Sequence, residues 1–306
     1  MPDYSRAILG ILTAEMQTML TALNKDTPEN FRRKANNFLL SQFDPDVLFY
    51  TVFTSSFESK SGNALENCAK AIARLRYGPN SVPSVIQGLG ATAEDVRRYT
   101  VPTTDKQIIL TRKKISEVTS KASSALSRHR KSGRGKTQTA TTGVSQSILR
   151  DEIVNIVYEN SDKLEEKPID LLIHVSGTES LCMEIKLGGD LDSSNAPAQL
   201  AKFLTLCAIA DAPQIEGYFA TIYNKDGEGK RFTGTVRSYF ADDMILAGSE
   251  FWIKILPSEI SFEQFVGLYH QSLEAIGMNT AIRDLVDMLA PVSDRKKKKI
   301  IEELTK

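Results

Sequence analysis

A β-hairpin pattern in the middle of the chain constrains the fold more than any other feature. Two segments rich in β-branched and other apolar residues, 168–175 and 180–187, flank the turn sequence Ser-Gly-Thr-Glu at 176–179. Apolar runs bounded by turn residues are typical of paired antiparallel strands. A hairpin symmetric about Gly177 places Asp170 opposite Glu184. The residues on one face are then all apolar: Ile169, Leu171, Ile173, Leu181, Met183 and Ile185.

The other face of the predicted hairpin carries two carboxylates and one ammonium group. A one-residue shift in pairing would move these charges into the apolar face, so the pattern itself favours one register. In that register the Cα atoms of Asp170 and Glu184 lie about 4.5–5.5 Å apart, and the two carboxylates repel unless a cation binds them. Mg²⁺ prefers such oxygen ligands, and Lys186 can contact a phosphate oxygen or a metal-bound water. The alternative is a solvent-exposed ladder of alternating charges, which needs no ligand.

The rest of the chain alternates between helical and strand patterns, which predicts a mixed α/β fold. Near the N-terminus, apolar residues recur every three or four positions and indicate helices. Thr27 and Pro28 suit the start of a second helix, and Ser61-Gly62 suits the start of a third. Residues 47–54 fit either a strand or a buried helix. Beyond the hairpin we expect strands at 216–223, 243–247 and 251–256, and helices at 146–159, 196–210, 261–277, 279–290 and 294–304.

A net charge of zero conceals two oppositely charged segments. The chain has 38 basic and 38 acidic residues. Residues 105–144 contain 10 basic and 2 acidic residues, a net charge of +8, whereas residues 145–250 contain 9 basic and 18 acidic residues, a net charge of −9. Such asymmetry is typical of a nucleic-acid surface beside a metal site, although unrelated solvated surfaces give the same pattern.

Composition argues against several classes of protein. No apolar run approaches 18 residues, so we expect no membrane-spanning helix, and Asp3 and Glu15 bracket the first apolar stretch in a way that does not fit a signal peptide. Cys68, Cys182 and Cys207 are too few and too widely spaced for a disulfide framework or a zinc finger. We therefore expect a protein of the reducing cytoplasm.

The hairpin residues resemble a known nuclease signature. Pro168-Ile169-Asp170, followed after thirteen residues by Glu184-Ile185-Lys186, resembles the PD-(D/E)XK motif, and within that superfamily it is most similar to type II restriction endonucleases. Ile169 departs from the motif because it separates the proline from the first acid. The resemblance implies a restriction-endonuclease-like core, in which helices flank a central mixed β-sheet. It also implies that Asp170, Glu184 and the Ile185 backbone carbonyl bind one or two Mg²⁺ ions, while Lys186 positions or activates the attacking water.

A second segment supports the same resemblance. Residues 58–66, with the sequence Glu-Ser-Lys-Ser-Gly-Asn-Ala-Leu-Glu, resemble the serine-rich start of a helix found in many restriction endonucleases. In those enzymes a glutamate of the helix approaches the metal site, and Glu66 is the matching catalytic residue here. Ser59, Lys60 and Ser61 would contact DNA phosphate at the helix start, where backbone N–H groups are unpaired. The alternatives are a surface glutamate and serines that simply cap a helix.

Further residues are candidates for contacts with DNA. Ser193, Ser194 and Asn195 precede a predicted helix on which Gln199 and Lys202 lie on the side of the site. The glycine-containing sequence at 133–137 lacks the spacing of a phosphate-binding loop, so we expect no nucleotide cofactor. The basic side chains expected to neutralise phosphates are Arg112, Lys113, Lys114, Lys121, Arg128, Arg130, Lys131, Arg134 and Lys136.

The resemblance implies a Mg²⁺-dependent type II restriction endonuclease that hydrolyses phosphodiester bonds in both strands of a short duplex DNA sequence. Such an enzyme serves a restriction-modification system in a prokaryotic cytoplasm, and a palindromic site favours a homodimer. We expect a single nuclease domain over 1–306. Its parts are a mainly helical region at 1–104, the basic DNA-contacting segment at 105–145, the catalytic β-core at 146–257 and helices at 258–306. Two alternatives stay open: a PD-(D/E)XK DNA repair or junction-resolving nuclease, and a non-enzymatic DNA-binding protein.

Overall fold

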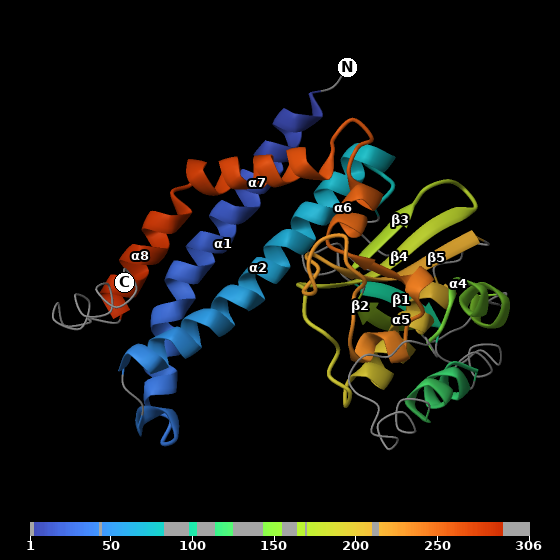
Figure 1. Cartoon of the computed structure of the whole chain (residues 1–306), viewed down its shortest axis with the longest axis horizontal. Coiled ribbons are helices and arrows are strands. Elements are labelled where there is room, and N and C mark those ends of the chain that lie inside the picture. Colours follow the sequence, from blue (N-terminus) through green and yellow to red (C-terminus); the bar gives the residue numbers. More distant parts are fainter. Residues whose placement is uncertain are drawn as a thin grey trace. The chain divides into compact units, whose positions relative to one another are not determined.

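The described part of the chain forms two compact units, and Figure 1 labels their helices and strands. The computed structural model describes residues 3–42, 45–82, 98–102, 114–124, 143–154, 164–168, 170–209 and 214–289. One unit, the helical unit, comprises Met1–Cys68 and Glu259–Lys306, and the other, the sheet unit, comprises Ala69–Ser258. The single nuclease domain expected from the sequence stays a prediction.

The helical unit is built around the long helix α1 (Tyr4–Ala35). Its apolar residues recur every three or four positions, as the sequence pattern predicts, and they are buried against neighbouring helices. α1 packs against α7 (Phe262–Ala275) and α8 (Met278–Leu289). The first part of α2 (Pro45–Tyr77) also belongs to this unit, where Asn67 Nδ2 donates a 3.1 Å hydrogen bond to Glu15 Oε2 of α1.

Two helix starts predicted in this unit are wrong. α1 continues through Thr27 and Pro28, and Thr27 is fully buried instead of capping a new helix. Proline inside a helix costs about 3 kcal/mol, so packing on both sides of it must outweigh that loss. Ser61-Gly62 lies within α2, which already includes residues 47–54. The aromatic residues of that segment show why it is helical: Phe49, Phe53 and Phe57 stack at four-residue spacing, with ring centroids 5.7 and 5.8 Å apart.

The sheet unit contains a mixed four-stranded sheet in the order β3-β4-β5-β6. β3 (Leu171–His174) pairs with β4 (Glu179–Lys186) in antiparallel fashion, as the hairpin pattern predicts. β5 (Gln214–Thr221) and β6 (Ile245–Ala247) are parallel to β4. A separate two-stranded antiparallel sheet is formed by β1 (Arg98–Pro102) and β2 (Leu164–Pro168).

Helix α5 (Ala196–Ile209) connects the parallel strands β4 and β5 and covers one face of their sheet. Cys182 of β4 and Phe219 of β5 belong to one buried apolar cluster with Leu200 and Phe203 of α5. Gly217 permits close contact in this cluster, because a Cβ atom there would overlap Leu149 and Phe203. Since side chains alternate along a strand, the same face of β4 also carries Glu184 and Lys186.

The remaining elements partly agree with the sequence predictions. Residues 251–256 are predicted as a strand, but 251–255 belong to α6 (Ser249–Ile255), which buries Phe251, Trp252 and Ile255 on one side, and Leu256 is its C-cap. The indole Nε1 of Trp252 donates to the Ile222 carbonyl at 2.9 Å, an anchor that favours the helix. The predicted helix at 146–159 is seen as α4 (Gln146–Ile148) followed by a π-helical turn (Leu149–Val154). Residues 114–124 are also helical, and the helix predicted at 294–304 lies outside the described residues.

The fold class is therefore the predicted mixed α/β arrangement, with helical N- and C-terminal parts and a central mixed sheet. Among the residues that the structure describes, no helix has the length and apolarity needed to cross a membrane.

Candidate active site

The hairpin has the predicted register. Leu171 lies opposite Met183 and Ile173 lies opposite Leu181, and all four side chains are buried. Asp170 immediately precedes β3 and continues this register toward Glu184. One detail differs from the prediction, because Pro168 ends β2 instead of beginning the hairpin. The predicted position of Ile169 is not tested, because that residue is outside the described residues.

Asp170, Glu184 and Lys186 meet at the C-terminal end of β4. Asp170 Oδ2 accepts a 2.9 Å hydrogen bond from the Ile185 amide, which fixes the carboxylate beside the strand. Lys186 Nζ lies 2.6 Å from Glu184 Oε1 and 3.9 Å from Asp170 Oδ2. One ammonium group therefore links the two carboxylates, as expected for side chains on one face of the hairpin.

The burial of Glu184 argues against the alternative of a solvated charge ladder. The side chain of Glu184 is 2% exposed, that of Asp170 is 18% exposed and that of Lys186 is 34% exposed. A charged carboxylate is strongly destabilised by such burial unless cations and hydrogen bonds compensate it. The hairpin therefore holds a buried carboxylate that depends on neighbouring cations.

A second lysine reaches the same carboxylate from a different element. Lys202 of α5 places its Nζ 3.1 Å from Glu184 Oε2 and 3.4 Å from Oε1. The sequence predicts Lys202 on the side of the site and in contact with DNA, but it does not predict this contact with Glu184. Helical spacing places Lys202 on one face of α5 with Gln199, but which residue that face meets depends on tertiary packing.

The oxygen atoms at this end of β4 suit a hard divalent cation. Successive peptide groups of a strand point to opposite sides, and the Lys186 carbonyl accepts from the Ile222 amide of the β5 side at 2.9 Å. The Ile185 carbonyl consequently faces the side of Asp170. Thr221, the register partner of Lys186, has a buried hydroxyl with no hydrogen-bond partner among the described residues. Two carboxylates and a carbonyl are ligands that Mg²⁺ accepts together with several waters.

These protein groups do not form a complete set of metal ligands by themselves. Among the described residues, no group of three or more His, Cys, Asp and Glu side chains is arranged to hold a metal. Mg²⁺ is commonly bound by one or two carboxylates plus water and substrate phosphate oxygens, so two carboxylates are sufficient for a site that DNA completes.

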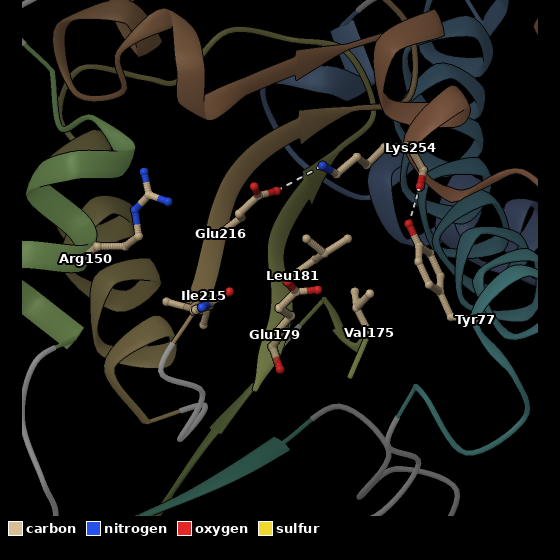
Figure 2. Close-up of a pocket in the computed structure, with 10 residues that line it drawn as sticks. Tyr77, Arg150, Val175, Glu179, Leu181, Ile215, Glu216 and Lys254 are labelled. Carbon is tan, nitrogen blue, oxygen red and sulfur yellow. Dashed lines mark hydrogen bonds and ion pairs between the residues drawn. The ribbon is translucent and has the colours of Figure 1, made fainter. Parts of the chain in front are cut away.

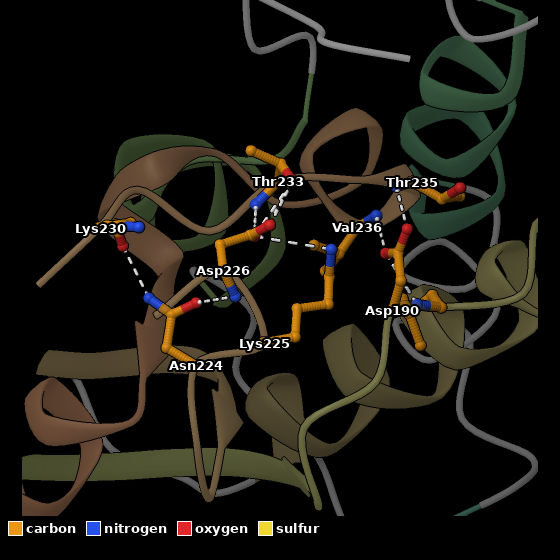
Figure 3. Close-up of polar contacts among 9 residues, drawn as sticks. Asp190, Asn224, Lys225, Asp226, Lys230, Thr233, Thr235 and Val236 are labelled. Atoms are coloured by element: carbon orange, nitrogen blue, oxygen red, sulfur yellow. Dashed lines mark hydrogen bonds and ion pairs between the residues drawn. The ribbon is translucent and has the colours of Figure 1, made fainter. Parts of the chain in front are cut away.

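The loop after β4 is held in place by one aspartate (Figure 3). The carboxylate of Asp190 accepts hydrogen bonds from the backbone amides of Thr235 and Val236 at 2.6 and 2.9 Å, and from the Leu191 amide at 2.8 Å. It therefore caps the 3₁₀ turn Thr235–Ser238. At Gly188, nearer the site, a Cβ atom would overlap the Tyr223 ring, so a larger residue there would displace that exposed side chain.

The predicted residues around the start of α5 are positioned by Asp192. Its carboxylate accepts from the Ser194 amide at 3.0 Å and from the Ser194 hydroxyl at 2.8 Å, and these hydrogen bonds lower the pKa of Asp192. Asn195 is the capping residue, since its carbonyl accepts from the Gln199 amide at 3.0 Å. Gln199 Oε1 is buried without a hydrogen-bond partner in the described part of the chain. Roles for Ser193, Ser194, Asn195 and Gln199 in DNA binding stay predictions.

The residues assigned to the second motif lie on α2 in the helical unit. Ser61 is mid-helix, and its hydroxyl donates to the Phe57 carbonyl at 2.7 Å. The predicted helix start with unpaired amides at this point is therefore wrong, because interior N–H groups bond to carbonyls one turn earlier. Lys60 pairs with Asp26 of α1 at 2.5 Å. Contacts of Ser59, Lys60 and Ser61 with DNA, and a catalytic role for Glu66, stay predictions.

Most of the predicted basic surface cannot be placed. Lys114 is described, and its Nζ pairs with Glu152 Oε2 at 2.7 Å on the surface. Lys121 is also described and lies exposed in the helical segment 114–124. The remaining basic residues of the predicted set lie outside the described residues: Arg112, Lys113, Arg128, Arg130, Lys131, Arg134 and Lys136.

A pocket of about 280 Å³ lies at the opposite end of β4 and β5 (Figure 2). Glu216 of β5 lines it and accepts from Lys254 Nζ at 2.9 Å and from the Tyr218 hydroxyl at 2.6 Å. The Tyr77 hydroxyl donates to the Lys254 carbonyl at 2.8 Å. Asp170, Glu184 and Lys186 are absent from the residues that line this pocket.

A protein-family model covers most of the chain. A family model described as "Type II restriction endonuclease, HinfI" matches residues 6–272. No curated protein and no solved structure matches the chain. The matched residues include both candidate carboxylates and both lysines at the end of β4.

Proposed function

Because this chain belongs to the HinfI family of type II restriction endonucleases, we propose that Asp170, Glu184 and Lys186 form its active site. The reaction is the Mg²⁺-dependent hydrolysis of phosphodiester bonds in both strands of a short duplex DNA sequence. The observation that carries the proposal is the convergence of two carboxylates on Lys186 at the C-terminal end of β4. In open sheets with parallel strands, ligands commonly bind beyond the C-terminal ends of the strands.

Each residue of the cluster has a role that follows from its position. Asp170, Glu184 and the Ile185 carbonyl hold the cation, and the Ile185 amide keeps Asp170 in place. When bound, Mg²⁺ polarises the scissile phosphate and makes a coordinated water more acidic. Lys186 is close enough to both carboxylates to orient the attacking water and to stabilise negative charge that develops on the phosphate.

The remaining assignments follow the same proposal. The basic residues of 112–136, the residues 193–195 and Gln199 bind DNA phosphates or bases, as do Ser59, Lys60 and Ser61. Glu66 supports the active site. The protein works in the cytoplasm of a prokaryotic cell as a homodimer, because two identical active sites related by a two-fold axis match a palindromic sequence and cut both strands.

Cleavage by carboxylate variants tests the proposal. Asp170→Ala and Glu184→Ala should each lower the rate of plasmid cleavage in Mg²⁺ by at least about a thousandfold, since each removes a ligand of an ion that contributes several kcal/mol. Binding to the same DNA in Ca²⁺, measured by gel shift, should persist. Glu216→Ala, which removes a lysine-paired carboxylate at the other end of the sheet, is the matched control and should cleave normally. Undiminished cleavage by both Asp170→Ala and Glu184→Ala would refute the assignment.

A further inference from the structure

Glu184 contacts two ammonium groups, although the motif explains only one of them. Lys186 comes from the same strand, whereas Lys202 comes from α5 and approaches both carboxylate oxygens. One carboxylate carries one negative charge, so two cations exceed what charge balance at Glu184 requires. Asp170, 3.9 Å from Lys186, takes up part of this excess. Among the described residues, Lys202 contacts no second carboxylate.

A metal ion and Lys202 need the same oxygens. Mg²⁺ binds oxygen at about 2.0–2.1 Å, and an ammonium group within hydrogen-bond distance of both Glu184 oxygens occupies the space and repels the ion. The ion can bind fully only when an ammonium group withdraws. Lys202 is better placed to do so, because it comes from a separate element and Glu184 is its carboxylate partner among the described residues, whereas Lys186 also lies 3.9 Å from Asp170 Oδ2. The flexible four-carbon stem of Lys202 allows the ammonium group to move.

We propose that Lys202 is a positioning residue that couples metal binding to DNA binding. Without DNA it neutralises Glu184 and competes with the divalent cation. When DNA is bound, its ammonium group moves to a phosphate oxygen and Glu184 becomes free for the metal. The inference rests on the proposed function and adds a reciprocal linkage: DNA raises the affinity for the cation, and the cation raises the affinity for DNA.

Cation binding without DNA tests the competition directly. Isothermal titration with Mn²⁺ alone should show that Lys202→Gln binds the ion about tenfold more tightly than the unmodified protein, a difference of about 1.4 kcal/mol. Lys202→Arg keeps the charge and should bind Mn²⁺ like the unmodified protein. Lys254→Gln, which removes the lysine paired with Glu216, should also leave Mn²⁺ binding unchanged. In the double variant Lys202→Gln/Glu184→Gln, the gain should vanish. Circular dichroism confirms that each variant is folded.

The salt dependence of DNA binding provides a second readout. In Ca²⁺, Lys202→Gln should reduce the slope of log K against log salt for duplex DNA by about 0.9, the value for one phosphate contact. An unchanged Mn²⁺ affinity in Lys202→Gln would overturn the competition, and an unchanged salt slope would overturn the phosphate contact. Either result leaves the cleavage test of Asp170 and Glu184 intact, so failure of this inference and failure of the proposed function are distinguishable.

Discussion

Glu184 and Glu216 are the same residue type, paired with lysine, at opposite ends of the parallel strands β4 and β5. Their side chains point to opposite faces of the sheet. Glu184 shares a face with its register partner Phe219 of β5. Glu216 lies an odd number of residues from Phe219 along the same strand, so its side chain is on the other face. Glu184 is 2% exposed and contacts two ammonium groups. Glu216 is 40% exposed, lies against an open pocket and contacts one lysine and one tyrosine hydroxyl.

The difference shows that an acid–lysine pair does not by itself mark a functional site. An exposed pair gains little because water and salt screen both charges. A buried carboxylate is kept only where cations compensate it, and removing that compensation is costly. The end of the sheet that buries a carboxylate under two lysines, with a second carboxylate beside it, is therefore the end that suits a metal ion.

Removal of both lysines from Glu184 should have the largest effect on stability. In Lys186→Gln/Lys202→Gln a nearly fully buried carboxylate loses both ammonium groups, and breaking a buried ion pair costs about 3–5 kcal/mol. Urea denaturation at neutral pH should show this loss in the free energy of unfolding. Lys254→Gln at the Glu216 end should change it by no more than about 1 kcal/mol.

A third substitution isolates the cause of that loss. Adding Glu184→Gln to the double lysine variant removes the uncompensated charge and should restore most of the stability. If the triple variant is as unstable as the double variant, the lysines contribute by packing and the contrast between the two ends is not electrostatic.

The loop beyond Glu184 should show an intermediate effect. Asp190→Ala removes the acceptor of the Thr235 and Val236 amides, and loss of a comparable helix cap costs about 1–2 kcal/mol. Asp192→Ala, which loses exposed contacts with Ser194, is the matched control and should cost less. Thermal unfolding compares the two. If Asp190→Ala were fully stable but needed more Mg²⁺ for cleavage, Asp190 would be a metal ligand instead of a structural cap.

The hairpin and its charged residues could be predicted from the sequence because they depend on local rules. Strand alternation and turn composition place Leu171 opposite Met183 and bring Asp170, Glu184 and Lys186 to one face. All of these residues fall within a segment of less than twenty positions, so no long-range packing had to be known.

The contact of Lys202 and the long helices could not be predicted in the same way. Lys202 reaches Glu184 only because α5 packs its apolar residues on the sheet, and the sequence of α5 does not state which strand residue its polar edge meets. Thr27-Pro28 and Ser61-Gly62 have the local composition of helix starts, yet tertiary packing extends α1 and α2 through them. The four-residue spacing of Phe49, Phe53 and Phe57 was the local signal for the second of these helices.

The smallest expected effect concerns pH and the Glu216 end. Burial raises the pKa of Glu216, but hydrogen bonds from the Tyr218 hydroxyl and Lys254 and the charge of Lys254 lower it more, so its pKa lies below the usual value. A carboxylate with a lowered pKa in the folded state stabilises the protein above its unfolded pKa, about 4.3, and this stabilisation is lost as the pH falls through the folded pKa. Glu216→Gln should therefore be less stable than the unmodified protein near pH 6, by less than about 1 kcal/mol because the group is partly exposed, and the difference should be smaller near pH 3. Urea unfolding at both pH values measures it. A difference that grows toward acid pH would contradict the favourable pairing of Glu216 with Lys254. It would also remove the contrast between this weakly paired end of the sheet and the proposed active site.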